Sequence, residues 1–168
     1  MAIRVAINGF GRIGRLVLRS ILEHGRTDIK VVAINDLGPV ETNAHLLRFD
    51  SVHGRLPMPV TVEGDRILVG GQDILVTSVR DPKDLPWREL DIDIAMECTG
   101  IFTARDKAAA HLDAGAKRVL ISAPGENADK TIVYGVNHAS LTKADTIVSN
   151  ASCTNNCLSP VVKVLNDL

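Results

Sequence analysis

The first 36 residues most constrain how this chain can fold. An apolar run at residues 3–7 leads directly into Asn8-Gly9-Phe10-Gly11-Arg12-Ile13-Gly14. Apolar residues then recur at helical spacing up to Leu22, and a second apolar run at 30–34 stops at Asn35-Asp36. The order therefore predicts a strand, a glycine turn that opens a helix, and a second strand that ends at an acidic residue.

This arrangement is suited to binding a dinucleotide. A helix N-terminus offers unpaired N–H groups and the positive end of the helix dipole to a pyrophosphate. We expect Gly9 to permit the tight turn, Gly11 to let the phosphates approach the backbone, and Gly14 to let helix and strand pack closely. Asp36 would accept hydrogen bonds from the adenosine ribose and repel a 2′-phosphate, which predicts NAD as the cofactor. An ordinary βα unit with a glycine-rich turn is the alternative.

The net charge and composition of the whole chain restrict its ligands, its location and its cysteine chemistry. The formal charge of the 168-residue chain is −1 at pH 7, so nothing attracts nucleic acid or an anionic membrane globally. No apolar run approaches the ~20 residues of a membrane span and no signal sequence is evident, which predicts a cytoplasmic protein. The chain has three cysteines, which indicate no disulfide framework. Its five histidines are scattered along the sequence and are interpreted as structural or solvated, so no metal site is expected.

Later segments alternate between strand and helix patterns. Residues 40–49 predict a short helix with Leu46, Leu47 and Phe49 turned inward. Short β-rich runs within 59–79 predict an antiparallel insertion. Strands are then expected at 92–98, 118–122, 131–134 and 146–149, with one helix at 103–114.

These elements predict an α/β fold with a doubly wound, mainly parallel Rossmann-type sheet and a small antiparallel insertion. In such a sheet, ligands bind beyond the carboxyl ends of the strands at the switch in strand order. Gly9, Asp36, Thr99-Gly100 and Ser122 should converge there.

A second candidate site lies where the last strand passes into the closing helix. Cys153 begins that helix, where the dipole and the free amides favour a thiolate, and Ser152 is the expected N-cap. Cys98 and Cys157 are interpreted as small buried hydrophobes. A reactive thiolate beside a nicotinamide suggests oxidation of a carbonyl through a covalent thiohemiacetal and a thioester.

Seven segments resemble the phosphorylating glyceraldehyde-3-phosphate dehydrogenase family, and the similarity runs over the whole chain. They are residues 8–15, 35–37, 50–54, 97–103, 117–124, 135–137 and, above all, the Ala-Ser-Cys-Thr-Asn-Asn-Cys of 151–157. The resemblance implies oxidation of glyceraldehyde 3-phosphate to 1,3-bisphosphoglycerate with NAD and inorganic phosphate, in a homotetramer.

The resemblance also implies roles for individual residues. Cys153 would be the nucleophile, and the inorganic phosphate would be bound with help from Ser152 and Thr154. The cofactor phosphates would be surrounded by Phe10, Gly11, Arg12 and Ile13, with Asp36 on the ribose. The adenine would be bordered by Arg80, Thr99 and Phe102, and Ser122 would lie near the cofactor on its way to the nicotinamide.

The chain departs from the family pattern in sequence and in length. The family usually has Thr at the position of Asn155 and often Ala at that of Ser159. Its chains are roughly twice as long, so we expect residues 1–152 to form the dinucleotide-binding domain and 153–168 the first helix of a catalytic domain whose remainder is absent. The histidine base would lie in that remainder, which predicts that this chain alone is inactive.

Two other functions remain open at this stage. Erythrose-4-phosphate dehydrogenase shares the cysteine motif but commonly has Glu at the position of Asp36 and His at that of Ala123. A stand-alone NAD-binding module without chemistry is the second alternative.

Overall fold

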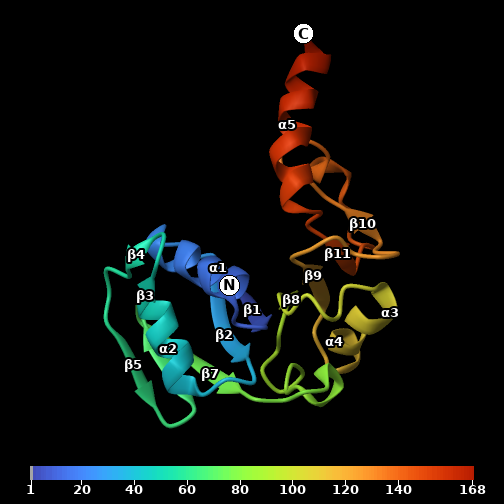
Figure 1. Cartoon of the computed structure of the whole chain (residues 1–168). Helices are drawn as coiled ribbons and strands as arrows, with labels where there is room; N and C mark the ends of the chain where they lie inside the picture. The colour runs from blue at the N-terminus through green and yellow to red at the C-terminus, as the bar shows by residue number, and fades with distance from the viewer. Residues whose placement is uncertain (1) are drawn as a thin grey trace.

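The computed structural model describes residues 2–168 and contains one large sheet with helices on its faces (Figure 1). The sheet has nine strands in the order β10-β11-β9-β8-β1-β2-β7-β6-β5. Their bounds are β1 Ile3–Asn8, β2 Ile29–Asn35, β5 Val60–Glu63, β6 Arg66–Val69, β7 Gln72–Thr77, β8 Ile94–Glu97, β9 Arg118–Ile121, β10 Lys130–Thr131 and β11 Ile147–Ser149. A separate two-stranded hairpin pairs β3 (Phe49–Asp50) with β4 (Gly54–Arg55).

All pairings from β10 across to β7 are parallel, whereas β5, β6 and β7 pair antiparallel. The chain runs from β1 to β2, continues to β5 at the outer edge and returns through β6 to β7 beside β2. It then crosses to β8 on the other side of β1. This reversal is the topological switch point of a doubly wound sheet. The predicted fold class and the antiparallel segment are confirmed, and because β7 also pairs with β2, that segment continues the main sheet.

The helices are α1 (Arg12–Glu23), α2 (Val40–Arg48), α3 (Arg105–Ala108), α4 (Ala110–Asp113) and α5 (Cys153–Asp167), with 3-10 turns η1 (Pro82–Asp84) and η2 (His138–Ser140). One hydrophobic cluster packs α1 and α2 against the sheet through residues such as Leu18, Leu47 and Ile34. A second cluster lies around the fully buried Trp87 and includes Ala6, Val32 and Ala33. The central strands are therefore buried on both faces, as their continuous apolar runs require.

Some sequence predictions were wrong in detail. Leu46 is 37% and Phe49 43% exposed, because α2 buries only one stripe, which includes Leu47, and Phe49 lies beyond its end. The predicted helix at 103–114 is interrupted at Ala109, and Tyr134 is exposed outside the two-residue strand β10.

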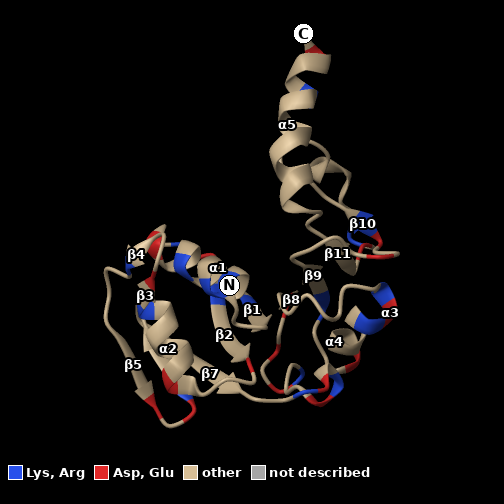
Figure 2. Ribbon diagram, in the orientation of Figure 1, with Lys and Arg blue, Asp and Glu red and all other residues tan. Residues whose placement is uncertain are grey.

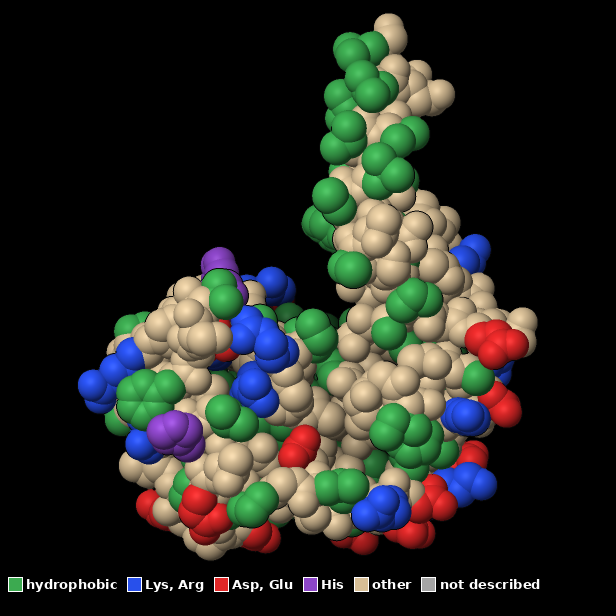
Figure 3. All heavy atoms as spheres, in the orientation of Figure 1, with side chains coloured by type: hydrophobic (Ala, Val, Ile, Leu, Met, Phe, Trp, Pro, Cys, Tyr) green, Lys and Arg blue, Asp and Glu red, His purple; other side chains and the backbone are tan. Residues whose placement is uncertain are grey.

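Helix α5 projects from the edge of the sheet that carries β11 (Figure 1). None of its residues is buried, and its charged side chains are only Lys163 and Asp167 (Figure 2). Its apolar side chains line the helix at the surface of the molecule (Figure 3), and they include Leu158, Val161, Val162, Val164 and Leu165.

Candidate functional site

The carboxyl ends of the parallel strands lie in register along one edge of the sheet. Asn35 of β2 pairs with Asn8 of β1, Asn8 with Glu97 of β8, Glu97 with Ile121 of β9, and Ile121 with Ser149 of β11. Four strand spacings separate β2 from β11, which corresponds to about 19 Å. The glycine turn, Asp36 and the start of α5 all follow these strand ends directly.

The first and third glycines of the turn are sterically required. Gly9 has φ of +89°, and a Cβ there would lie 2.7 Å from the Thr99 amide nitrogen. A Cβ on Gly14 would lie 2.3 Å from the Gly9 carbonyl oxygen and 2.9 Å from Ile7 Cγ2. A Cβ on Gly11 would meet nothing within 4 Å, so open space lies above the middle glycine.

The N-terminus of α1 is available to an anion. Its N-cap, Gly11, provides no side-chain cap, and the first turn contains no acidic residue. The first amides of a helix have no partner within the helix, so uncapped amides can bind a phosphate. Ile13 is 51% exposed, Arg12 pairs with Asp50 at 3.0 Å, and the Phe10 side chain is buried in the core. Phe10 therefore supports the turn from the core, since its amide donates to Asp36 and its carbonyl accepts from Arg15.

Asp36 joins the glycine turn to the end of β2. Its Oδ2 accepts a hydrogen bond from the Phe10 amide at 2.8 Å, and its Oδ1 accepts from the Gly38 amide at 2.8 Å. Each carboxylate oxygen can accept a second bond. Asp36 Oδ1 also accepts from Asn43 Nδ2 at 3.5 Å, so the acceptor position left for a ribose hydroxyl lies on Oδ2.

A cleft of about 510 Å³ lies between the ends of β1, β2 and β8. Six of the predicted site residues line it: Gly9, Gly11, Asp36, Arg80, Thr99 and Phe102. Its apolar rim includes Leu37 and Ile101, which are 55% and 65% exposed. The residues predicted for the site that do not line this cleft are Phe10, Arg12, Ile13, Gly14, Gly100, Ser122, Ser152, Cys153 and Thr154.

Ser122 lies at the next strand end, beside the cleft. Its amide donates to the Glu97 carbonyl at 3.0 Å, and its hydroxyl contacts Cys98, which does line the cleft. Burial raises the pKa of the Cys98 thiol to about 11, while the Ser122 contact lowers it and the nearby Glu97 raises it. Cys98 is therefore an unreactive thiol near neutral pH.

Cys153 is the first residue of α5 and is exposed. Ser152 is the N-cap, and its hydroxyl oxygen accepts from the Asn155 amide at 3.0 Å. The Asn155 side chain accepts from the Ser152 amide and hydroxyl in return, which completes a capping box. Ala151, with φ of 58°, turns the chain from β11 into this helix.

The prediction that Cys157 is buried is wrong. The residue is exposed because α5 projects from the sheet and no residue of the helix is buried. Both Cys153 and Cys157 are therefore accessible, one helical turn apart, and only Cys153 lies in the first turn.

Sequence reasoning missed a buried polar network at the cleft, of which Asn8 and Asn35 line the cleft itself. Asn8, Asn35 and Glu97 each end an apolar strand and are 5% exposed or less. They join Trp87 and His111, both 0% exposed, in one hydrogen-bond network. A polar residue at the end of each buried strand was the available signal.

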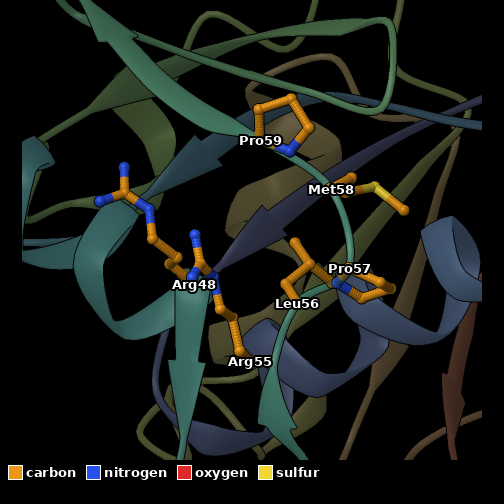
Figure 4. A pocket seen from close by; sticks show the side chains of 6 residues that line it. All are labelled: Arg48, Arg55, Leu56, Pro57, Met58 and Pro59. Carbon is orange, nitrogen blue, oxygen red and sulfur yellow. The ribbon is translucent and has the colours of Figure 1, made fainter.

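A second cleft, of about 450 Å³, lies between α2 and the segment that follows β4 (Figure 4). The side chains of Arg48 and Arg55 lie side by side at its rim. Arg48 donates to the Val60 carbonyl at 2.5 Å, and both guanidinium groups pack on the Phe49 ring at 5.9 Å. These cations therefore already have partners within the chain.

The described part of the chain contains no group of three or more His, Cys, Asp or Glu residues arranged to hold a metal ion. Within residues 2–168, no helix is long and apolar enough to cross a membrane.

Comparisons with known proteins agree with this geometry. The family model for "Glyceraldehyde 3-phosphate dehydrogenase, NAD binding domain" matches residues 3–105. The chain is 72% identical over 167 residues to a glyceraldehyde-3-phosphate dehydrogenase of Xanthobacter flavus and 71% identical over 167 residues to that of Cereibacter sphaeroides. It is 55% identical over 168 residues to that of Geobacillus stearothermophilus. Each match covers 99% of this chain and 50% of the relative, so the chain spans about half the length of these curated relatives.

Proposed function

Because the chain belongs to the glyceraldehyde-3-phosphate dehydrogenase family and matches its NAD-binding domain, we propose that it is the NAD-binding half of an enzyme that oxidises glyceraldehyde 3-phosphate. NAD is the cofactor of this family, and inorganic phosphate would be the second substrate. The observation that carries the proposal is the single edge of the sheet, where the glycine turn, Asp36 and the start of α5 follow neighbouring strands.

The cleft would hold the adenosine end of NAD. Asp36 Oδ2 would accept a hydrogen bond from a ribose hydroxyl, and the adenine would lie among Arg80, Thr99 and Phe102. The pyrophosphate would lie above Gly11 and accept from the first amides of α1, which have no side-chain cap. The nicotinamide would then extend past Ser122 toward α5.

Cys153 would perform the covalent chemistry. Its thiolate would attack the aldehyde carbon and form a thiohemiacetal, whose hydroxyl proton goes to a base. NAD, when bound in the cleft, would supply the hydride acceptor, so that hydride loss from that carbon would leave an acyl thioester on Cys153. Inorganic phosphate, bound with the help of Ser152 and Thr154, would then attack the thioester and release the thiolate and 1,3-bisphosphoglycerate.

Residues 1–152 would form the dinucleotide-binding domain and residues 153–168 the first helix of a catalytic domain. By the family resemblance, the histidine base would come from the half of the relatives that this chain does not span. His111 cannot serve, since it is fully buried and hydrogen-bonded to Trp87 and Glu97. The complete enzyme would be a cytoplasmic homotetramer.

The test is an NADH absorbance assay with glyceraldehyde 3-phosphate and inorganic phosphate. We expect no turnover by this chain alone and clear turnover by a chain extended to the length of its relatives. Loss of the general base alone lowers a reaction rate by about 10²–10⁴-fold. In the extended chain, Cys153→Ser should abolish turnover and Cys157→Ser should retain it. Full activity of Cys153→Ser, or a faster reaction with erythrose 4-phosphate, would contradict the proposal.

A further inference from the structure

Glu97 is a buried carboxylate on which four hydrogen-bond donors converge. The residue is 1% exposed. Its Oε1 accepts from the Thr99 amide at 2.8 Å and from the Thr99 hydroxyl. Its Oε2 accepts from Asn8 Nδ2 at 2.7 Å and from His111 Nε2 at 2.9 Å. Each carboxylate oxygen can accept two hydrogen bonds, so these four groups fill the acceptor positions of Glu97.

The orientation of Asn8 toward Glu97 is fixed from the backbone. The Val79 amide can only donate, and it donates to Asn35 Oδ1 at 2.8 Å. Asn35 Nδ2 must then donate, and it does so to Asn8 Oδ1 at 2.8 Å. Asn8 is thereby left with its Nδ2 facing Glu97.

The tautomer of His111 is fixed from the opposite side. The indole N–H of Trp87 can only donate, and it lies 3.0 Å from His111 Nδ1. Nδ1 must therefore accept, which places the imidazole proton on Nε2, facing Glu97. His111 thus bridges Trp87 and Glu97.

Two of the residues that are hydrogen-bonded to Glu97 form part of the wall of the cleft. Thr99 and Asn8 both line it, whereas Glu97, His111 and Trp87 do not. The Thr99 amide also lies directly against the glycine turn, where a Cβ on Gly9 would approach it to 2.7 Å. A shift of Thr99 would therefore move the turn on which the pyrophosphate depends.

We propose that Glu97, held by His111 and Trp87, positions Thr99 and the glycine turn and thereby sets the affinity of the cleft for NAD. The proposal rests on the NAD-binding function proposed above. It makes Glu97, His111 and Trp87 positioning residues, since none of them lines the cleft. When such hydrogen bonds hold a binding site in one arrangement before its ligand arrives, less conformational entropy is lost on binding.

The test compares two substitutions of His111 by calorimetric titration with NAD. A glutamine at this position can donate to Glu97 and accept from Trp87, as the imidazole does, whereas a leucine can do neither. We expect His111→Leu to weaken NAD binding about tenfold and His111→Gln to stay within about threefold of the wild type. Leu85→Ala, which opens a cavity in the same hydrophobic cluster as Trp87, should lose stability but keep its NAD affinity.

Equal losses in the two His111 variants, or wild-type affinity in folded His111→Leu, would overturn the inference. If His111→Leu does not fold, ¹⁵N NMR of the wild-type imidazole decides: protonation at Nε2 alone supports the inference, and protonation at Nδ1 overturns it. Failure of the wild-type chain to bind NAD would contradict the proposed function itself, so the two failures are distinguishable.

Discussion

At the residue scale, Gly9 is closely packed against Thr99, whereas Gly11 of the same motif faces open space. Gly9→Ala should destabilise the chain by about 2 kcal/mol or more, since a positive φ alone costs about 1–2 kcal/mol and the added Cβ would also meet Thr99. Gly11→Ala should cost about 1 kcal/mol or less, as expected for an N-cap. Urea unfolding checks both values.

The Gly9 and Gly11 variants also distinguish an effect on folding stability from an effect on NAD binding. Gly11→Ala should weaken NAD binding about tenfold or more, because its Cβ fills the space that the pyrophosphate would occupy. Calorimetry on the folded variant measures this loss. Unchanged affinity in Gly11→Ala would show that the phosphates do not approach the backbone at this residue.

The three cysteines provide a second comparison at this scale. Iodoacetamide should label Cys153 first, because the first turn of α5 favours its thiolate. Cys157 is the matched control, since it is also exposed and lies one turn further along the same helix. Cys98 should label last because burial raises its pKa to about 11. Site-resolved mass spectrometry gives the order, and faster labelling of Cys157 would remove the physical basis for the nucleophile.

At the element scale, Asp129 ties α3 to β11. Its carboxylate accepts from the Thr146 and Ile147 amides at 2.8 and 3.0 Å and from Arg105 at 2.7 Å. The Ile147 amide is the main cause that holds the pKa of Asp129 well below its usual value of 3.8. This carboxylate therefore stabilises the fold fully above its unfolded-state pKa and loses that effect as the pH falls through its lower folded-state pKa.

The variant Asp129→Asn should accordingly be about 1 kcal/mol less stable than the wild type at pH 7. The difference should shrink as the pH is lowered from 4 toward and below 2. Urea unfolding of both proteins across this range checks the prediction. A difference that stays constant with pH would show that the loss has another origin.

The elements that sequence predicted well are those set by local patterns. The apolar run before Gly9, the glycine spacing and the Ser152 cap depend on neighbours within a few positions, and each has the expected local structure. Phe49 was misplaced because its ring packs on Arg55, a partner on the next strand of the hairpin.

The polar strand ends were visible in the sequence, but the partners that they contact could not be predicted, for the same reason at longer range. Asn8 and Glu97 are 89 positions apart, and Trp87 and His111 are 24 apart. No periodicity within either segment encodes such a contact. The glycine turn and the start of α5 lie at one edge only through the fold, which the alternation of strands and helices did predict.

At the scale of the whole molecule, α5 presents an uncovered apolar surface. Val161 and Leu165 are 55% and 68% exposed, one turn apart on the same helix. We expect concentration-dependent self-association, which sedimentation velocity would detect. The double variant Val161→Glu, Leu165→Lys should suppress it and favour the helix through an i,i+4 pair. Lys163→Gln is the control that leaves the apolar surface intact, and equal association in all three proteins would exclude α5 as the contact.

The central claim is that this chain carries an NAD site at one edge of its sheet, with Asp36 binding the adenosine ribose. Calorimetric titration with NAD and NADP tests it most directly. The account predicts binding of NAD with a clear preference over NADP, because the Asp36 carboxylate would repel a 2′-phosphate, and loss of that preference in Asp36→Ala. Equal affinity for the two cofactors, or an unchanged preference in Asp36→Ala, would contradict it.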